Sequence, residues 1–154
     1  MATPSERLDQ LGITLPAVPA PAGSYISARR SGSLVFTAGQ VPLVDGKPAA
    51  LGKVGAEISI EEASALARIC ALNALAAVDA LVGIDAVAGV VKVVGFVASA
   101  PGFTDQPKVI NGASDLLGEI FGDAGRHARS AVGVAELPLG VPVEVEVVVE
   151  LAGS

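Results

Sequence analysis

The sequence has 154 residues, of which 51% are apolar and 17% are charged, and its formal net charge at pH 7 is −6. This length predicts one domain, residues 1–154, and the apolar composition excludes a disordered chain. The acidic balance argues against nucleic-acid binding, because a phosphate-binding surface requires clustered lysine and arginine.

In the N-terminal arm, residues 1–21, SERLDQL is predicted to form a short helix. An extended connector should follow, because the prolines of LPAVPAPAG restrict the chain. A hairpin is expected next, with one strand near residues 25–29, a turn at 31–33 and a second strand from Leu34. Arg29 and Arg30, beside this turn, are expected to be surface charges. VDGKP carries the Asp-Gly signal of a tight turn.

A long buried helix is predicted in the middle of the chain. Ser59 and Glu62 fit the capping-box pattern, and the helix should run to about Val82 and end at Gly83. Its polar positions fall on one narrow stripe of the helix: Glu61, Arg68 and Asp79. We therefore expect a sheet and a second helix to cover the rest of its surface.

The second half predicts a β-branched strand in AVAGVVKVVGFVAS, a loop in PGFTDQP, and a helix in KVINGASDLLGEIFG that Gly112 and Gly118 weaken. Two closing strands, 129–135 and 143–151, should form a hairpin centred near Leu137–Pro138. The order ββ-α-β-α-ββ predicts an α+β fold with one mixed sheet and two long helices on one face.

Metal and disulfide chemistry have few candidate residues. Cys70 is the single cysteine and His127 the single histidine, which excludes an intrachain disulfide and argues against a zinc site. Cys70 lies among alanines and leucines and is expected to be a buried apolar residue. With no leader-like stretch after Met1 and valine runs too short to cross a bilayer, we expect a cytoplasmic protein with no membrane contact.

The closing strands suggest how the candidate site is formed. In the last strand one face carries Val143, Val145, Val147, Val149 and Leu151, and the other carries Glu144, Glu146, Val148 and Glu150. If the valine faces of both strands meet the helices, Arg129, Ala131 and Gly133 project onto the same face as Glu144. Small and apolar residues beside charge suggest a surface that another subunit covers, with a cleft left open. The alternative is a solvated face whose charges only solubilise it.

Four segments together resemble the RidA family, also called the YjgF-like or reactive-intermediate deaminase family. ARSAVGVAELPLGVPVEVEVVVE, residues 128–150, is similar to its C-terminal signature, and LVFTAGQVPLVDGKP to its strand and GQ turn. GSYISARRSG resembles its N-terminal segment, and VINGASDLLGEIFG its asparagine-containing helix. The resemblance extends from about Ala22 to the end of the chain. It implies a chorismate-mutase-like fold and a homotrimer with sheets inward and three clefts between subunits.

The resemblance also implies an activity, the hydrolysis of reactive 2-imino or enamino acids to 2-oxo acids and ammonia. No cofactor is implied, because an iminium is already electrophilic. Arg129 matches the arginine that holds the substrate carboxylate, and Glu144 the carboxylate that orients or deprotonates water. Tyr25 matches a tyrosine that lines the cleft from the neighbouring chain. Gly39 and Asn111 match positions that shape the pocket.

One departure from the family pattern leaves the activity open. Ala131 stands at a substrate-binding position where typical deaminases carry cysteine, so thiol chemistry is impossible there. A non-catalytic binder or sensor of small carboxylates or 2-oxo acids would retain Arg129 without requiring Glu144. An endoribonuclease or translation inhibitor is a further alternative, which the acidic balance disfavours. His127 is a candidate for the rim of the cleft.

Overall fold

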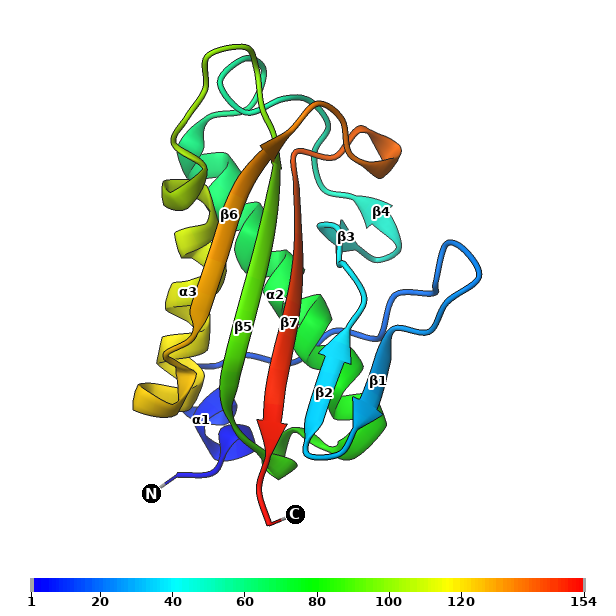
Figure 1. Ribbon diagram of the computed structural model, residues 1–154, viewed down its shortest axis with the longest axis vertical. Coiled ribbons are helices and arrows are strands. Elements are labelled where there is room, and N and C mark those ends of the chain that lie inside the picture. Colours follow the sequence, from blue (N-terminus) through cyan, green and yellow to red (C-terminus); the bar gives the residue numbers. More distant parts are fainter. Residues whose placement is uncertain (1, 154) are drawn as a thin grey trace.

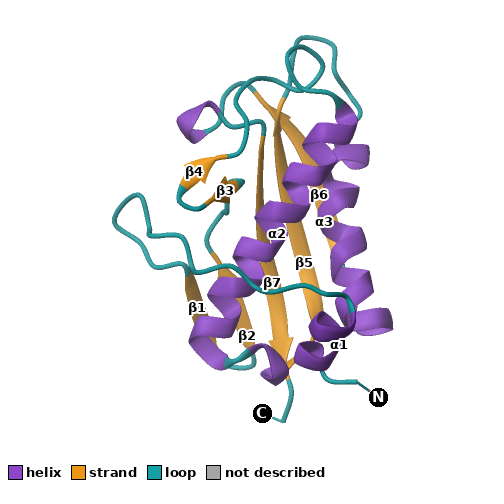
Figure 2. Ribbon diagram, turned by 180° about the vertical axis from the view of Figure 1, so that it is seen from behind, coloured by secondary structure: helices purple, strands orange, loops and turns teal. Residues whose placement is uncertain are grey.

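Two long helices cover one face of a five-stranded mixed sheet in the computed structural model, which describes residues 2–153 (Figures 1 and 2). The predicted α+β architecture is therefore confirmed. The elements in chain order are α1 (Pro4–Gln10), β1 (Ala28–Ser31), β2 (Leu34–Thr37), β3 (Leu43–Val44), β4 (Lys47–Pro48), α2 (Ile60–Val82), β5 (Val87–Ala98), α3 (Gln106–Phe121), β6 (Ala128–Val134) and β7 (Val143–Leu151).

Local sequence signals predicted most of these elements. Ser59 caps α2 by accepting a hydrogen bond from the backbone N–H of Glu62. The Asp45-Gly46 turn joins β3 to β4, and both residues have the positive φ that this tight turn requires. The first strand is the exception, because β1 begins at Ala28 and Tyr25 lies outside it.

The helix α3 begins two residues before its predicted start. Its first turn includes Pro107, which is tolerated there because the first backbone N–H groups of a helix have no partner within the helix. Gly112 has a packing role: a Cβ atom at this position would overlap the carbonyl of Ser64 on α2 and lie 2.7 Å from its carbonyl carbon. The glycine predicted to weaken α3 therefore lets the two helices approach closely.

The order of strands in the sheet is β1-β2-β7-β5-β6, and this corrects the predicted hairpin of the two closing strands. β6 pairs in parallel with β5 alone, whereas β7 lies between β2 and β5 and runs antiparallel to both. The connection from β5 to β6 runs through α3, as a parallel pair requires a crossover. β6 is consequently an edge strand, separated from β7 by β5 (Figure 1).

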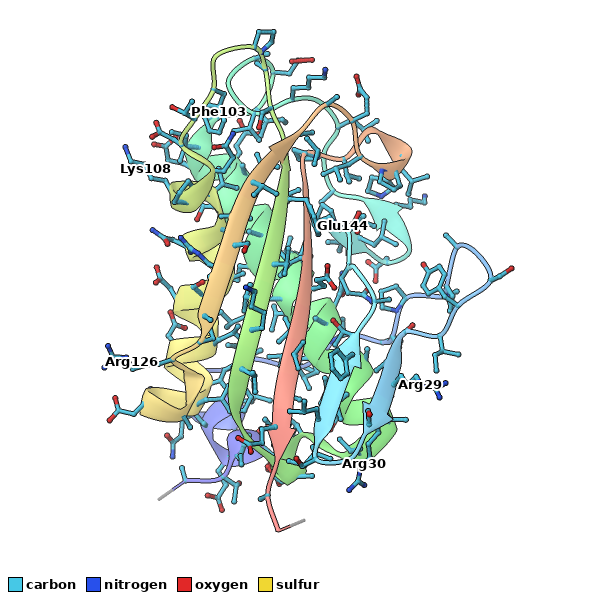
Figure 3. The ribbon with its side chains drawn as sticks, in the orientation of Figure 1. Arg29, Arg30, Phe103, Lys108, Arg126 and Glu144 are labelled. Carbon is cyan, nitrogen blue, oxygen red and sulfur yellow. The ribbon has the colours of Figure 1, made fainter. Side chains whose placement is uncertain are left out.

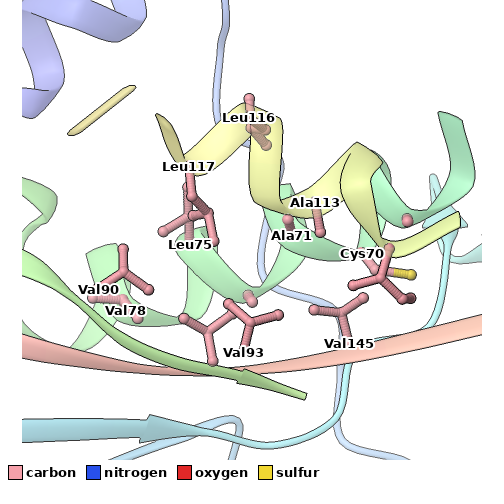
Figure 4. Close-up of a cluster of buried hydrophobic side chains, with 14 of the residues drawn as sticks. Cys70, Ala71, Leu75, Val78, Val90, Val93, Ala113, Leu116, Leu117 and Val145 are labelled. Atoms are coloured by element: carbon pink, nitrogen blue, oxygen red, sulfur yellow. The ribbon is translucent and has the colours of Figure 1, made fainter. Parts of the chain in front are cut away.

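The core lies between the sheet and the helices (Figure 4). Cys70 on α2 is fully buried, as predicted, and its thiol donates to the carbonyl of Val143 at 3.7 Å. Burial first, and the charge of Glu144 second, raise the pKa of this thiol well above its ordinary value, so Cys70 is a structural residue. α2 is long and apolar enough to span a membrane, but most of that stretch is buried against β7 and α3.

The N-terminal arm is tied to the body at α1 and then crosses the helices (Figure 2). Leu8 is buried, and Ser5 donates to the Asp85 carboxylate from its backbone N–H (2.8 Å) and its hydroxyl (2.6 Å). These hydrogen bonds lower the pKa of Asp85. No helix or strand forms between Leu11 and Ser27, so the predicted connector is confirmed.

Candidate functional site

The six predicted site residues form two groups that lie apart within the chain. One group lines a cavity at the end of β2 and β7, and the other lies where β6 meets α3. The groups are Tyr25, Gly39 and Glu144 in the cavity, and Asn111, Arg129 and Ala131 on β6 and α3.

This division corrects the predicted placement of Arg129 beside Glu144. The Arg129 side chain bonds to α3, and a Cβ atom on Gly133 would meet Gln106 of α3, so this face of β6 is turned toward the helices. Val132 is instead 44% exposed on the other face, which is the face that carries Glu144. The prediction was wrong because it assumed that the valines of an edge strand face the helices. On this face Ala131 packs against the core, whereas Gly133 stays exposed beside Gln106.

Glu144 lies in a cavity of about 630 Å³, on the open face of the sheet (Figure 3). The cavity wall is largely apolar and includes residues 19–22 of the connector, Val41, Leu43 and Leu139. Burial of the carboxyl group, and secondly the charge of Glu146, raise the pKa of Glu144 above its ordinary value of 4.5. Among the described residues none hydrogen-bonds to its side chain, so this carboxylate is available to a ligand or to water.

A break in the pairing of β2 with β7 makes room for the Glu144 carboxyl group. After Phe36 the two strands separate, and the hydroxyl of Thr37 accepts the backbone N–H of Val147 at 3.0 Å. Pairing resumes at Gln40 and Val145. Gly39 lies in the gap, where a Cβ atom would overlap Oε2 of Glu144 and lie 2.9 Å from its Cδ. Glycine at this position is therefore required by the position of the carboxylate.

Tyr25 approaches the same cavity from the connector. This residue is 48% exposed, and its hydroxyl oxygen accepts a hydrogen bond of 3.0 Å from the backbone N–H of Ala22. Because the oxygen is the acceptor in this bond, the phenol proton remains available to a ligand. The arm thus both walls the cavity and orients its tyrosine.

Arg129 is held against one side of α3. Its Nη1 donates to Oδ1 of Asn111 (2.8 Å) and to Oγ of Ser114 (3.2 Å), and its Nη2 donates to the carbonyl of Pro107 (3.4 Å). Ala131, two residues further along β6, packs against the core. The three partners of Arg129 recur at helical spacing, four and then three residues apart, so they share one side of α3.

Ser114 was not among the predicted site residues, and His127 was expected only as a candidate for the rim of the cleft. His127 Nε2 lies 2.9 Å from Ser114 Oγ, and His127 Nδ1 lies 2.6 Å from the carbonyl oxygen of Gly125. The signal in the sequence was the position of Ser114 one helical turn after Asn111, but only the crossing of β6 over α3 brings His127 beside it. Arg29 and Arg30 are exposed surface charges, as predicted (Figure 3).

Neither group of site residues resembles a metal centre. Within residues 2–153, no cluster of three or more histidine, cysteine, aspartate or glutamate side chains could hold a metal ion. The cavity residues supply one carboxylate and one phenol, and the β6–α3 residues supply a guanidinium and an amide. This chemistry fits general base catalysis on one side and anion binding on the other.

Comparison with known proteins identifies the family. Residues 5–151 match the family model described as "YjgF/chorismate_mutase-like, putative endoribonuclease", so the chain belongs to the YjgF/chorismate-mutase-like family. The predicted family resemblance is confirmed over nearly the whole chain.

Three similar proteins show how closely this chain follows its relatives. Protein TCP17 of Trypanosoma cruzi is 48% identical over 146 residues, covering 94% of this chain and 91% of the relative. The crystal structure of a putative endoribonuclease from Shewanella oneidensis MR-1 is 35% identical with a TM-score of 0.92, covering 97% of this chain and 100% of that one. E. coli TdcF, crystallised with bound serine, is 26% identical with a TM-score of 0.65, covering 90% and 96% respectively.

Proposed function

We propose that this protein hydrolyses small reactive 2-imino or enamino acids to 2-oxo acids and ammonia, in clefts between the subunits of a homotrimer. The proposal rests on two complementary half-sites, the cavity around Glu144 and the group around Arg129 on β6 and α3. Glu144 lies in an apolar cavity that raises its pKa, and Arg129 is held on α3 with donors to spare. A substrate with a carboxylate at one end and an electrophilic carbon beside it requires both.

The open face of the sheet supports assembly with other copies. Phe36 and Val132 are 45% and 44% exposed there, and Val94, Phe96 and Val148 share this face with the charged residues Lys92, Glu144 and Glu146. Large apolar side chains exposed on a sheet face favour a partner. In the proposed trimer the open faces pack inward. Because β6 is an edge strand, Arg129 lies at the border of the sheet, where it can meet the Glu144 cavity of a neighbour.

The chemistry of the proposed reaction needs only these groups. Arg129 binds the substrate carboxylate, and Glu144 takes a proton from a water molecule whose oxygen attacks the imine carbon. Glu144 returns its proton to the nitrogen of the resulting amino alcohol, the C–N bond breaks as ammonia leaves, and the hydroxyl group releases its proton to become the new carbonyl. Ammonia takes up a proton in solution. No electrons are transferred, so no redox cofactor enters the proposal.

The lining of the cavity favours particular substrates. Prolines of the arm, Val41, Leu43 and Leu139 surround the one carboxylate, and the lining includes no lysine or arginine. An apolar substrate side chain is therefore expected to be preferred over an acidic one. Serine bound to TdcF, a structural neighbour of this chain, is consistent with small amino-acid-like carboxylates as ligands.

Two variants separate binding from chemistry. Arg129→Ala should abolish the binding of 2-oxo acids or benzoate in calorimetry. Arg129→Lys should retain only part of this affinity, because an ammonium lacks the planar, two-point hydrogen bonding of a guanidinium. Glu144→Gln should lower kcat for freshly generated imines by about 10²–10⁴-fold while carboxylate binding remains. If Glu144→Gln hydrolyses imines like the wild type while Arg129→Ala still loses binding, the protein is a carboxylate sensor.

A further inference from the structure

The hydrogen bonds of Arg129 leave a specific part of its guanidinium group unused. A guanidinium has five N–H donors. Two from Nη1 and one from Nη2 go to α3, on Asn111, Ser114 and Pro107. Within the described part of the chain, Nε–H and one N–H of Nη2 bond to no other group. Nε and Nη2 are neighbouring nitrogens on one edge of the planar guanidinium, and the N–H groups of such an edge are the pair that a carboxylate accepts with both oxygens.

The hydroxyl of Ser114 is itself oriented by His127. The carbonyl of Gly125 can only accept, so Nδ1 of His127 carries the proton in the 2.6 Å bond. In the neutral imidazole Nε2 is then an acceptor, and the Ser114 hydroxyl donates to it at 2.9 Å. The lone pairs of Ser114 Oγ are left to accept Nη1 of Arg129 at 3.2 Å. The hydrogen bonds run in one direction, from Arg129 through Ser114 and His127 to Gly125.

We infer that Ser114 and His127 are positioning residues of the carboxylate site, which hold Nη1 of Arg129 on α3 and so present its Nε/Nη2 edge to the substrate carboxylate. The inference rests on the proposed function, because it assigns the ligand that this edge receives. Neither residue touches the substrate. Their effect is on affinity, since an arginine free to rotate must lose conformational freedom each time it binds a carboxylate in two-point geometry.

Matched substitutions test this role through binding of benzoate or a 2-oxo acid, measured by calorimetry on the full-length protein. Ser114→Ala should weaken binding about 5- to 10-fold, the range expected for one orienting hydrogen bond, and Ser114→Thr should restore it because the hydroxyl is retained. With imine substrates, KM should rise by a similar factor in Ser114→Ala while kcat changes less than twofold. Ser64→Ala on α2, where the hydroxyl has no partner among the described residues, is the matched control and should bind as the wild type.

His127 is tested by a pair of amide variants that divide its two contacts. His127→Gln places an amide oxygen near Nε2 and retains an acceptor for Ser114, whereas His127→Asn keeps only the donor to Gly125. Binding should therefore persist in His127→Gln and weaken in His127→Asn. The rescue by Gln and Thr separates positioning from a loss of folding, because all of these variants alter the same packed region.

The outcomes distinguish this inference from the proposed function. If Arg129→Ala abolishes carboxylate binding while Ser114→Ala and His127→Asn bind as tightly as the wild type, the positioning role is wrong and the carboxylate site stands. If the wild type binds no carboxylate, or Arg129→Ala binds as well as the wild type, the carboxylate site itself falls, and the positioning role falls with it. Weakened binding in Ser114→Ala and His127→Asn, restored by Thr and Gln, supports the inference.

Discussion

The substitution Gly39→Ala isolates the position of the Glu144 carboxyl group. The new Cβ atom would overlap Oε2 of Glu144 and lie 2.9 Å from Cδ and 3.3 Å from Cγ. Carbon atoms pack comfortably at about 3.5 Å or more, so Cδ must withdraw by at least about 0.6 Å and Oε2 by more. The backbone of Gly39 has no positive φ, so alanine is conformationally acceptable there. The variant should fold while its carboxylate is displaced.

The expected effect is on catalysis and not on carboxylate binding. A displacement approaching 1 Å in a group that handles the attacking water can lower the rate by about 10²-fold, so we expect kcat to fall by about 10- to 100-fold. Release of 2-oxo acid from freshly generated imines measures kcat, and calorimetry with benzoate measures the Arg129 half-site, which should be unchanged. The free energy of unfolding, measured by thermal denaturation, should stay within about 1 kcal/mol of the wild-type value, because alanine also restricts the unfolded chain.

Gly118→Ala is the matched control for this substitution. Gly118 lies exposed in α3 with no atom near the position of the added Cβ, so alanine should stabilise the helix by about 0.5–1 kcal/mol and leave kcat unchanged. The role assigned to the position of the Glu144 carboxyl group is refuted if Gly39→Ala turns over imines at the wild-type rate although a crystal structure shows this group displaced. The predicted displacement is refuted if the carboxyl group has not moved.

Four further predictions concern pH dependence, assembly, the N-terminal arm and nucleic acid. Burial raises the pKa of Glu144, so kcat should decrease on acidification with a midpoint at a pH above 4.5, where Glu144 becomes protonated. A midpoint at or below pH 4.5 in the pH–rate profile would contradict this. The wild type should be a trimer by light scattering, and Val132→Glu should dissociate it; a monomeric wild type, or a variant that stays trimeric, rejects the proposed assembly. Hydrogen bonds from Ser5 lower the pKa of Asp85, so the ionised Asp85 carboxylate stabilises the docking of α1 at pH values above 3.8, the ordinary pKa of aspartate. This stabilisation is lost as the pH falls below 3.8. Relative to the intrinsic exchange rate at each pH, amides of α1 should therefore be less protected at acid pH in the wild type, and poorly protected at every pH in Asp85→Ala; protection that is insensitive to both changes would show that other contacts hold the helix. Labelled single-stranded RNA at low salt should show no submicromolar binding, because the net charge of −6 offers few cations for counterion release; tight binding that weakens steeply with salt would reveal a local basic patch.

The sequence by itself determined the elements of this protein and its family. Capping at Ser59, the Asp45-Gly46 turn and the long apolar stretch around Cys70 are local signals, because each depends on hydrogen bonds or periodicity within a few residues. The family signature likewise lies in short contiguous runs. These features do not depend on how the strands are arranged in the sheet, and the structure contains all of them.

The tertiary structure alone decided which face of the sheet each site residue occupies. Alternation along a strand establishes which side chains share a face, but it does not establish which face the helices cover. Because α3 carries the chain across the sheet, β6 becomes a parallel edge strand with Arg129 toward α3 and Val132 toward the open face. The contact of His127 with Ser114 has the same origin, since a helix residue and the residue just before β6 meet only where the fold packs them together.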